Sequence, residues 1–282
     1  MRIDAHGHGM HADRDATGTY IPPLRHGWVA GAQTPKDYVE GCRKRGVDGV
    51  VLLDPAHVAF GLKEIFGEFV IPVPMVDIDA TTPQEIDALL SRGAAGIKFI
   101  CPMHSYCDDR YFPLYDVIRA RGACAVFHVG YLSDTLFRPG ALLARKDIVD
   151  ITDMRPAAID RIARKFGDLK ILMAHFGNPW FEEAWNTMRN YKNVYADISG
   201  GTAHRRAMAM WTQLFTLDER PDYASIGKLC FASDSSFCFQ GIYQFEGHID
   251  FYERFYEAMK VPADLREKID RGNTRMLFGL GG

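Results

Sequence analysis

Eight short apolar runs recur along this chain, each leading into a stretch with helical periodicity, and no other property of the sequence narrows the choice of fold as much. The runs are rich in Val and Ile and nearly continuous rather than alternating, as expected for parallel strands covered on both faces. We expect strands at residues 2–6, 49–54, 70–76, 96–100, 123–128, 170–175, 194–198 and 228–234. We expect helices at residues 35–45, 62–69, 83–92, 114–121, 156–166, 181–191, 205–215, 245–259 and 262–271.

This alternation predicts one α/β domain over residues 1–282: a single, slightly distorted (β/α)8 barrel of the TIM type with extra C-terminal helices. Single barrels of this kind routinely reach about 250 residues, and the composition shows no break along the chain. The alternative is an open doubly wound sheet, which a glycine-rich phosphate-binding turn after the first strand would support. The first strand leads instead into His6-Gly7-His8.

Composition and charge exclude several classes of protein. Hydrophobic residues make up 47% and charged residues 24% of the 282 positions, as in an ordinary globular chain. A net charge of −3 gives no basic footprint for nucleic acid or a membrane surface, and no apolar run approaches the roughly 18 residues of a membrane span. Residues 2–4 already resemble a strand and leave no room for an apolar signal region. We therefore expect a cytoplasmic protein with a small-molecule substrate and no nucleic-acid or membrane partner.

Six cysteines are present and none forms a CxxC pair. In a chain of this length they are expected to be free thiols rather than a disulfide framework. They are Cys42, Cys101, Cys107, Cys124, Cys230 and Cys238.

Four histidines and one aspartate come directly after apolar runs, at the ends of four expected strands. His6 and His8 end the first strand, where residues i and i+2 point the same way, so two imidazoles lie side by side as two ligands of one metal would. His128, His175 and Asp234 end the fifth, sixth and eighth strands, and in a barrel these ends meet at one mouth. Imidazole and carboxylate suit Zn, Mn, Fe or Ni, so we predict a divalent metal site there.

At these residues the chain resembles the amidohydrolase superfamily, particularly its amidohydrolase-2 branch of metal-dependent hydrolases, lactonases and non-oxidative decarboxylases such as the aminocarboxymuconate semialdehyde and resorcylate enzymes. The resemblance covers nearly the whole chain and includes residues 3–8, 96–99, 128, 174–177, 233–234 and 272–279. It implies that one divalent ion, with zinc expected first and Mn, Fe or Ni left open, is ligated by His6, His8, His128 and Asp234. It also implies two catalytic residues. Asp234 would accept a proton from the metal-bound water, and His175 would act as a general acid or base.

Lys98 ends the expected fourth strand inside the barrel ring and admits three interpretations. Carboxylated, it would bridge a second metal, as a lysine on this strand does in some members of the superfamily. As a cation, it would contact a carboxylate or carbonyl of the substrate. As a structural residue, it would be paired with a neighbouring acid. A buried lysine is rarely left unpaired, so each interpretation requires a partner, and we assign Lys98 to substrate binding.

Two long strand-to-helix loops, residues 9–34 and 129–155, are expected to act as lids or binding loops. Arg138 lies in the second loop, and Arg205 follows a Gly-Gly-Thr segment at an expected helix start, where free N–H groups can bind an anion. The alternative there is an ordinary capped helix with solvated arginines. With Lys98, Arg138 and Arg205 are the expected substrate-binding residues, and they favour a substrate that carries a carboxylate.

Three functions compete. The first is hydrolysis of an amide, ester or lactone of a small carboxylate-bearing molecule by a metal-activated water. The second is non-oxidative decarboxylation of an aromatic or enoic acid at the same metal site. The third is a metal-binding protein without turnover, against which the complete ligand set argues. The chain is shorter than most decarboxylases of the branch, which favours hydrolysis. A homodimer through the two helices after the last strand stays open.

Overall fold

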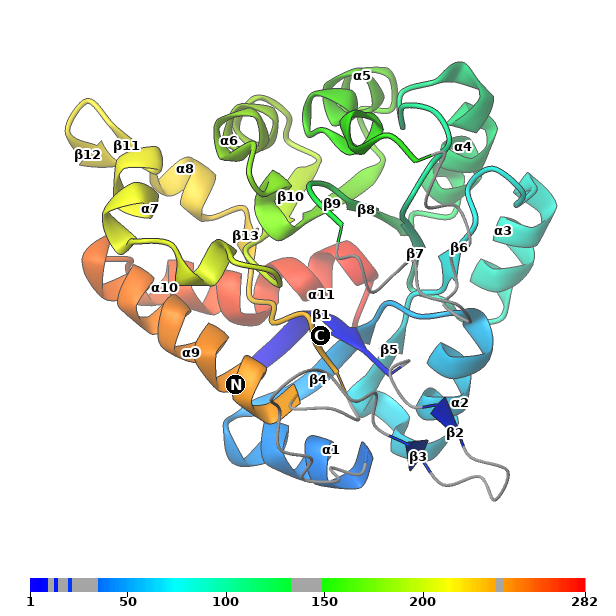
Figure 1. Ribbon diagram of the computed structural model, residues 1–282, viewed down its shortest axis with the longest axis horizontal. Coiled ribbons are helices and arrows are strands. Elements are labelled where there is room, and N and C mark those ends of the chain that lie inside the picture. The colour runs from blue at the N-terminus through cyan, green and yellow to red at the C-terminus, as the bar shows by residue number, and fades with distance from the viewer. Residues whose placement is uncertain (10–12, 15–19, 22–34, 133–148, 237–240, 282) are drawn as a thin grey trace.

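The computed structural model describes residues 1–9, 13–14, 20–21, 35–132, 149–236 and 241–281 (Figure 1). Parallel strands at its centre form two sheets, in the orders β14-β1-β4-β5 and β13-β10-β9-β8-β7-β6. Their bounds are β1 (Arg2–His8), β4 (Val47–Leu52), β5 (Val70–Pro72), β6 (Met75–Val76), β7 (Gly96–Phe99), β8 (Cys124–His128), β9 (Lys170–Ala174), β10 (Val194–Asp197), β13 (Leu229–Cys230) and β14 (Ser235–Ser236).

The two sheets meet at two places and form a ring of eight parallel segments. At one place β5 and β6 follow each other along the third segment and pair with different neighbours, β4 and β7. At the other, β13 pairs with β10 while β14 pairs with β1. Across that second break the backbone N–H of Ala5 donates to the carbonyl of Phe231 at 2.9 Å, and that of Asp234 to the carbonyl of His6 at 2.8 Å. The predicted eight-segment barrel is thereby confirmed.

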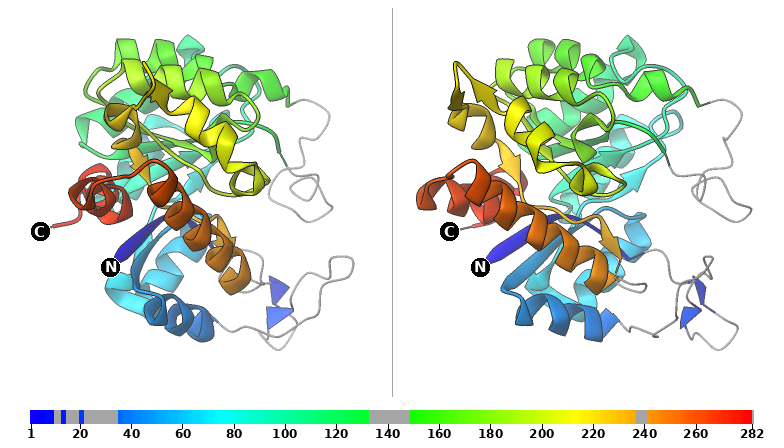
Figure 2. Two further views of the ribbon diagram at one scale, coloured as in Figure 1. Left: turned by 90° about the vertical axis from the view of Figure 1, so that its left-hand side faces the viewer. Right: turned by 60° about the vertical axis from the view of Figure 1, so that its left-hand side comes forward.

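Helices surround this ring on the outside (Figures 1 and 2). They are α1 (Pro35–Lys44), α2 (Ala56–Phe66), α3 (Pro83–Ser91), α4 (Phe112–Ala120), α5 (Ala157–Lys165), α6 (Phe181–Asn190), α7 (Met208–Leu214), α8 (Tyr223–Ile226), α9 (Gly241–Ala258), α10 (Ala263–Glu267) and α11 (Asn273–Phe278). Two short antiparallel pairs lie apart from the ring: β2 (Asp13–Arg14) pairs with β3 (Tyr20–Ile21), and β11 (Thr216–Leu217) pairs with β12 (Arg220–Pro221). Single-turn segments are η1 (Gly67–Phe69), η2 (Asp109–Tyr111), η4 (Ile151–Met154), η5 (His175–Gly177), η6 (Ala203–Arg205) and the π-helical η7 (Lys268–Gly272). None of the helices in the described parts of the chain is long and apolar enough to cross a membrane.

Two helix starts differ from the sequence-based expectation. Helix α2 starts at Ala56 rather than at residue 62, because the chain turns directly from the second strand through Pro55. Helix α7 starts at Met208 rather than at residue 205, because Arg206 is extended, with ψ 154°, and separates α7 from η6. The expected free state of the cysteines is confirmed for the five described ones.

The core has two layers, because successive side chains of a strand point to opposite faces. The outer layer lies between strands and helices and includes Ile97, Phe99 and Phe127. The inner layer fills the ring and includes Val126 of β8 together with Leu277 and Phe278 of α11. Helix α11 contacts β1, β9 and β13 and packs against the inner layer. Several buried polar side chains, among them Asp54, His128 and Asp197, lie at the carboxyl ends of the strands.

Candidate active site

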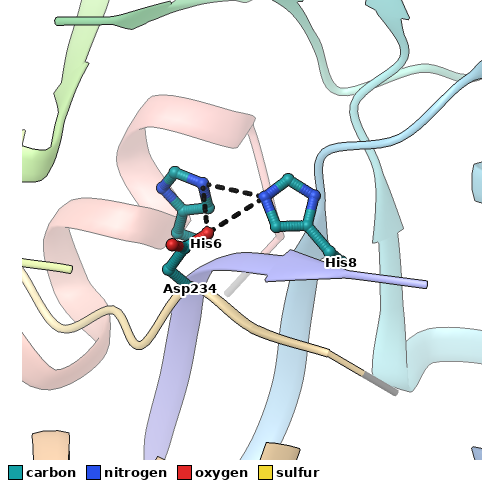
Figure 3. A group of neighbouring side chains, drawn as sticks. All are labelled: His6, His8 and Asp234. Carbon is teal, nitrogen blue, oxygen red and sulfur yellow. Dashed lines mark hydrogen bonds and ion pairs between the residues drawn. The ribbon is translucent and has the colours of Figure 1, made fainter. Parts of the chain in front are cut away.

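Three ligand-type atoms converge at the carboxyl end of β1 (Figure 3). His6 Nε2 lies 3.2 Å from His8 Nε2 and 3.3 Å from Asp234 Oδ1, and the third side of this triangle, from His8 Nε2 to Asp234 Oδ1, is 3.1 Å. A tetrahedral ion with ligand bonds of about 2.1 Å holds its ligand atoms about 3.4 Å apart. The donor set and its spacing therefore fit one divalent ion.

Local sequence explains how these side chains meet. His6 and His8 share one face of β1, and Gly7 between them lets β1 approach β4, since a Cβ there would lie 2.4 Å from Val50 Cγ1. Asp234 comes from the break in the eighth segment and has φ 57°. This left-handed conformation is uncommon for a residue other than glycine and is often retained at functional sites.

A second carboxylate lies behind His8. Asp54, fully buried at the end of the second strand, places Oδ1 3.6 Å from His8 Nδ1 and accepts a hydrogen bond from the backbone N–H of Gly9. Burial opposes a charge on His8, but hydrogen bonding to Asp234 and to Asp54 outweighs it and raises the pKa of His8 to about 10. Without a metal, His8 therefore carries a proton at neutral pH.

Asp197, at the end of β10, orients two of the histidines. It is fully buried and accepts hydrogen bonds from the His175 backbone N–H at 3.0 Å and from the N–H and hydroxyl of Ser199, and its Oδ2 lies 3.3 Å from His6 Nδ1. Burial by itself would raise the pKa of Asp197. The hydrogen bond from His6 and the nearby histidines outweigh burial and lower the pKa to about 2. A charged Asp197 holds the proton on His6 Nδ1 and leaves Nε2 free as a ligand, a common arrangement around protein metals.

His175 and His128 form a second pair beside the first cluster. His175 Nε2 lies 3.1 Å from His128 Nδ1, and the His175 ring centroid lies 4.7 Å from that of His6. Burial first, and then the charges of His175 and Lys98, hold the pKa of His128 well below its usual value. Burial also lowers the pKa of His175. Both imidazoles are therefore neutral near pH 7 and able to accept a proton.

Of the four ligands expected from the sequence, the structure brings His6, His8 and Asp234 within 3.3 Å of one another. His128 contacts His175 and the carbonyl of Tyr131, whose oxygen lies 3.3 Å from His128 Nε2. His128 thus borders the cluster on the side of the expected general acid or base.

The three residues expected to bind substrate lie in different parts of the molecule. Lys98 is 1% exposed within the ring. Arg205 is exposed on η6. The Thr202 side chain does not cap the start of that turn and instead accepts a hydrogen bond from Asn178 Nδ2 at 3.5 Å. Arg138, like most of both long loops, lies outside the described residues.

Sequence reasoning missed three groups at this site. Asp54 and Asp197 each directly follow an apolar run, the same signal that singled out Asp234, so the pattern could have found them. Gly200 was assigned to an anion loop, but its φ is 63° and a Cβ there would lie 2.3 Å from Asp234 Oδ2 and 2.8 Å from His175 Nδ1. Its lack of a side chain leaves room for both residues.

Comparison with known families identifies the family of this chain. The sequence model of the amidohydrolase-2 family, described as Amidohydrolase, matches residues 3–280. This chain belongs to the amidohydrolase-2 family. The resemblance inferred from the strand-end residues is thereby confirmed, and the protein is an enzyme of a metal-dependent family of hydrolases and decarboxylases.

Solved structures show the same fold at low sequence identity. A probable 2-pyrone-4,6-dicarboxylic acid hydrolase from Acinetobacter baumannii, with citric acid bound, has a TM-score of 0.65 and 14% identity, over 99% of both chains. A 4-oxalomesaconate hydratase from Rhodopseudomonas palustris has a TM-score of 0.60 and 17% identity, over 99% of this chain and 96% of the other. A 5-carboxyvanillate decarboxylase from Novosphingobium aromaticivorans, complexed with manganese and 4-hydroxy-3-methoxy-5-nitrobenzoic acid, has a TM-score of 0.54 and 14% identity, over 86% and 79%. No curated protein gives a significant match.

Proposed function

We propose that this amidohydrolase-2 protein is a cytoplasmic metal-dependent hydrolase that opens an amide, ester or lactone of a small substrate. The observation that carries the proposal is the triangle of His6 Nε2, His8 Nε2 and Asp234 Oδ1, with sides of 3.1–3.3 Å, at the mouth of the ring. His128 completes the ligand set in this proposal. Zinc is the metal proposed first, and the manganese complex of the similar decarboxylase makes manganese the alternative.

A divalent ion held there would polarise the carbonyl under attack and lower the pKa of a coordinated water. The chain's own residues supply the proton transfers. Burial opposes a charge on Asp234, but the adjoining histidines hold its pKa well below the usual range, so it is ionised and able to accept a proton from the attacking water. His175, neutral at pH 7, then takes up the proton that Asp234 received from the water and delivers it to the leaving group. Asp197 fixes the backbone of His175 through its hydrogen bond to that N–H.

Decarboxylation is the second candidate, because a decarboxylase is among the proteins of similar fold. It uses the same metal ligands, with His175 delivering a proton to the carbon that loses carbon dioxide. Product mass separates the two reactions, since hydrolysis adds one water to the substrate and decarboxylation removes carbon dioxide. The proposal of hydrolysis is overturned if turnover of every active substrate releases carbon dioxide without uptake of water.

Metal analysis of two matched variants tests the site itself. We expect about one metal equivalent per chain in the wild type and less than a tenth of that in His6→Ala, because one corner of the triangle is lost. His57→Ala removes an exposed histidine of α2 and should bind metal like the wild type. His175→Asn should keep the metal and lose turnover at least a hundredfold, as expected for a proton-transfer residue. Equal metal content in His6→Ala and His57→Ala would reject the proposed site.

A further inference from the structure

Lys98 lies inside the ring that carries the cluster of His6, His8 and Asp234. On β7 it aligns with Met75 of β6 and with Val126 of β8. Val126 belongs to the inner layer of the core, whereas Ile97 and Phe99, the neighbours of Lys98 in sequence, belong to the outer layer. Because side chains alternate along a strand, Lys98 points into the ring, where only 1% of it is exposed.

The ammonium group of Lys98 has no hydrogen-bond partner in the part of the chain that the structure describes. The two carboxylates whose charges act on it, Asp197 and Asp234, are engaged elsewhere. Asp197 accepts hydrogen bonds from His6, His175 and Ser199, and Asp234 Oδ1 faces the His6–His8 pair. Among the described residues, therefore, no acid is hydrogen-bonded to Lys98.

The charge of Lys98 also acts on the site histidines. The positive charge of Lys98 adds to burial in lowering the pKa values of His6, His128 and His175. A buried lysine that lacks a partner is unfavourable, because its desolvation is not offset. A ligand oxygen that reaches the cluster can supply that partner and would form a charge-assisted hydrogen bond.

We propose that Lys98 binds a carboxylate of the substrate, so that the enzyme acts on small carboxylic acids whose scissile group is held at the His6–His8–Asp234 cluster. The inference rests on the proposed function for the reaction, but the binding of a carboxylate by Lys98 can be measured without turnover. A carboxylated Lys98 that bridges a second metal is the competing outcome.

Binding of matched ligand pairs tests the inference. The probes are benzoate, succinate and 2-furoate, each compared with its uncharged amide, titrated calorimetrically into metal-loaded and metal-free protein. In the wild type at least one carboxylate should bind at least tenfold more tightly than its amide. Lys98→Met should lose that preference at unchanged metal content, and Lys98→Arg, which keeps the charge, should retain part of it.

Lys170→Met is the matched control, because Lys170 begins strand β9 and lies at the opposite end of the ring from the cluster. It should keep the carboxylate preference of the wild type. If circular dichroism shows that Lys98→Met does not fold, the ligand pairs measured on the wild type and on Lys98→Arg still test the inference. A wild type without any preference for carboxylates, or a Lys98→Met with an undiminished one, overturns the inference.

Intact mass and metal stoichiometry decide between the ammonium and the carboxylated lysine. Two metal equivalents in the wild type, one in Lys98→Met, and the mass of a carbon dioxide adduct on Lys98 would likewise overturn the carboxylate role. Failure of the proposed function gives a different result, because a wild type that binds no metal can still show the carboxylate preference in metal-free protein.

Discussion

Two residues of the site hold backbone conformations that only glycine adopts without strain. His175 has φ 63° and Asp234 has φ 57°, and such conformations cost of order 1–3 kcal/mol each. Hydrogen bonds hold them in place: the N–H of Asp234 donates to the carbonyl of His6, and the N–H of His175 to Asp197. The strain is therefore offset by the same network that orients the imidazoles.

Gly200 adds a steric condition at the same scale. Gly200→Ala would bring a Cβ to 2.3 Å from Asp234 Oδ2 at a backbone φ of 63°. We expect a loss of unfolding free energy of about 1–3 kcal/mol and weaker metal binding, measured by urea denaturation and metal titration. Gly61→Ala, inside α2 with nothing within 4 Å of its Cβ, should instead stabilise by about 0.5–1 kcal/mol. Equal effects of the two substitutions would contradict this account.

Sequence alone identified His6, His8 and Asp234 because each is a polar residue at the end of an apolar run, where an expected strand ends. Asp197 and Gly200 were missed for different reasons: the first carries the signal but has no metal-binding spacing, and the second acts by lacking atoms. Steric roles of this kind depend on which segments meet in space, and a sequence pattern does not contain that information.

At the scale of elements, α3 gives a measurable local contribution. The Thr82 side chain accepts a hydrogen bond from the Glu85 N–H at 3.3 Å, and Glu85 Oε2 accepts one from the Thr82 N–H at 2.7 Å. This reciprocal cap satisfies two helix-end donors. Thr82→Ala should lower the unfolding free energy by about 1 kcal/mol, measured by urea denaturation. Thr81→Ala, one residue outside the cap, should change it by less than about 0.5 kcal/mol, and a larger loss there would count against the cap.

The elements were predicted unequally well. All eight strand segments lie where the apolar runs are, because burial on both faces leaves a continuous signal. Helix starts were less predictable, since α2 begins directly behind Pro55 and α7 behind an extended Arg206. The break between β13 and β14 carries no composition signal, because it is defined by the strands with which each part pairs.

At the scale of the whole molecule, the buried histidines make the metal-free protein sensitive to acid. Burial, with the charge of Lys98, lowers the pKa of His6 from 6.5 to about 3. Between these values the unfolded chain binds a proton at His6 that the folded one does not, so the contribution of His6 to stability is complete above pH 6.5 and is lost as the pH falls toward 3. His128 and His175 act in the same direction. Burial raises the pKa of Asp4 to about 7, and this shift offsets the effect of one of these three histidines on stability in acid.

Denaturation of the metal-free protein at pH 7, 6, 5 and 4 measures this dependence. Each histidine that stays neutral in the fold contributes up to about 1.4 kcal/mol per pH unit. His8 and Asp4, which are protonated in the fold, oppose this effect between pH 7 and 6. The unfolding free energy should therefore change little between pH 7 and 6 and fall between pH 6 and 4. His57→Ala should show the same slope as the wild type, since His57 is exposed. A flat profile for the wild type would mean that the site histidines are protonated in the folded state.

The position of the cluster along the chain has a consequence for biosynthesis. His6 and His8 leave the ribosome before Asp234, which follows only after seven of the eight ring segments have been made. The hydrogen bonds that seat it join residues as far apart as Asp4 and Ser233, 229 positions along the chain. A nascent chain thus carries the proposed histidine ligands before the carboxylate of Asp234 has been made, so the complete proposed ligand set forms only when the last strand lies beside the first.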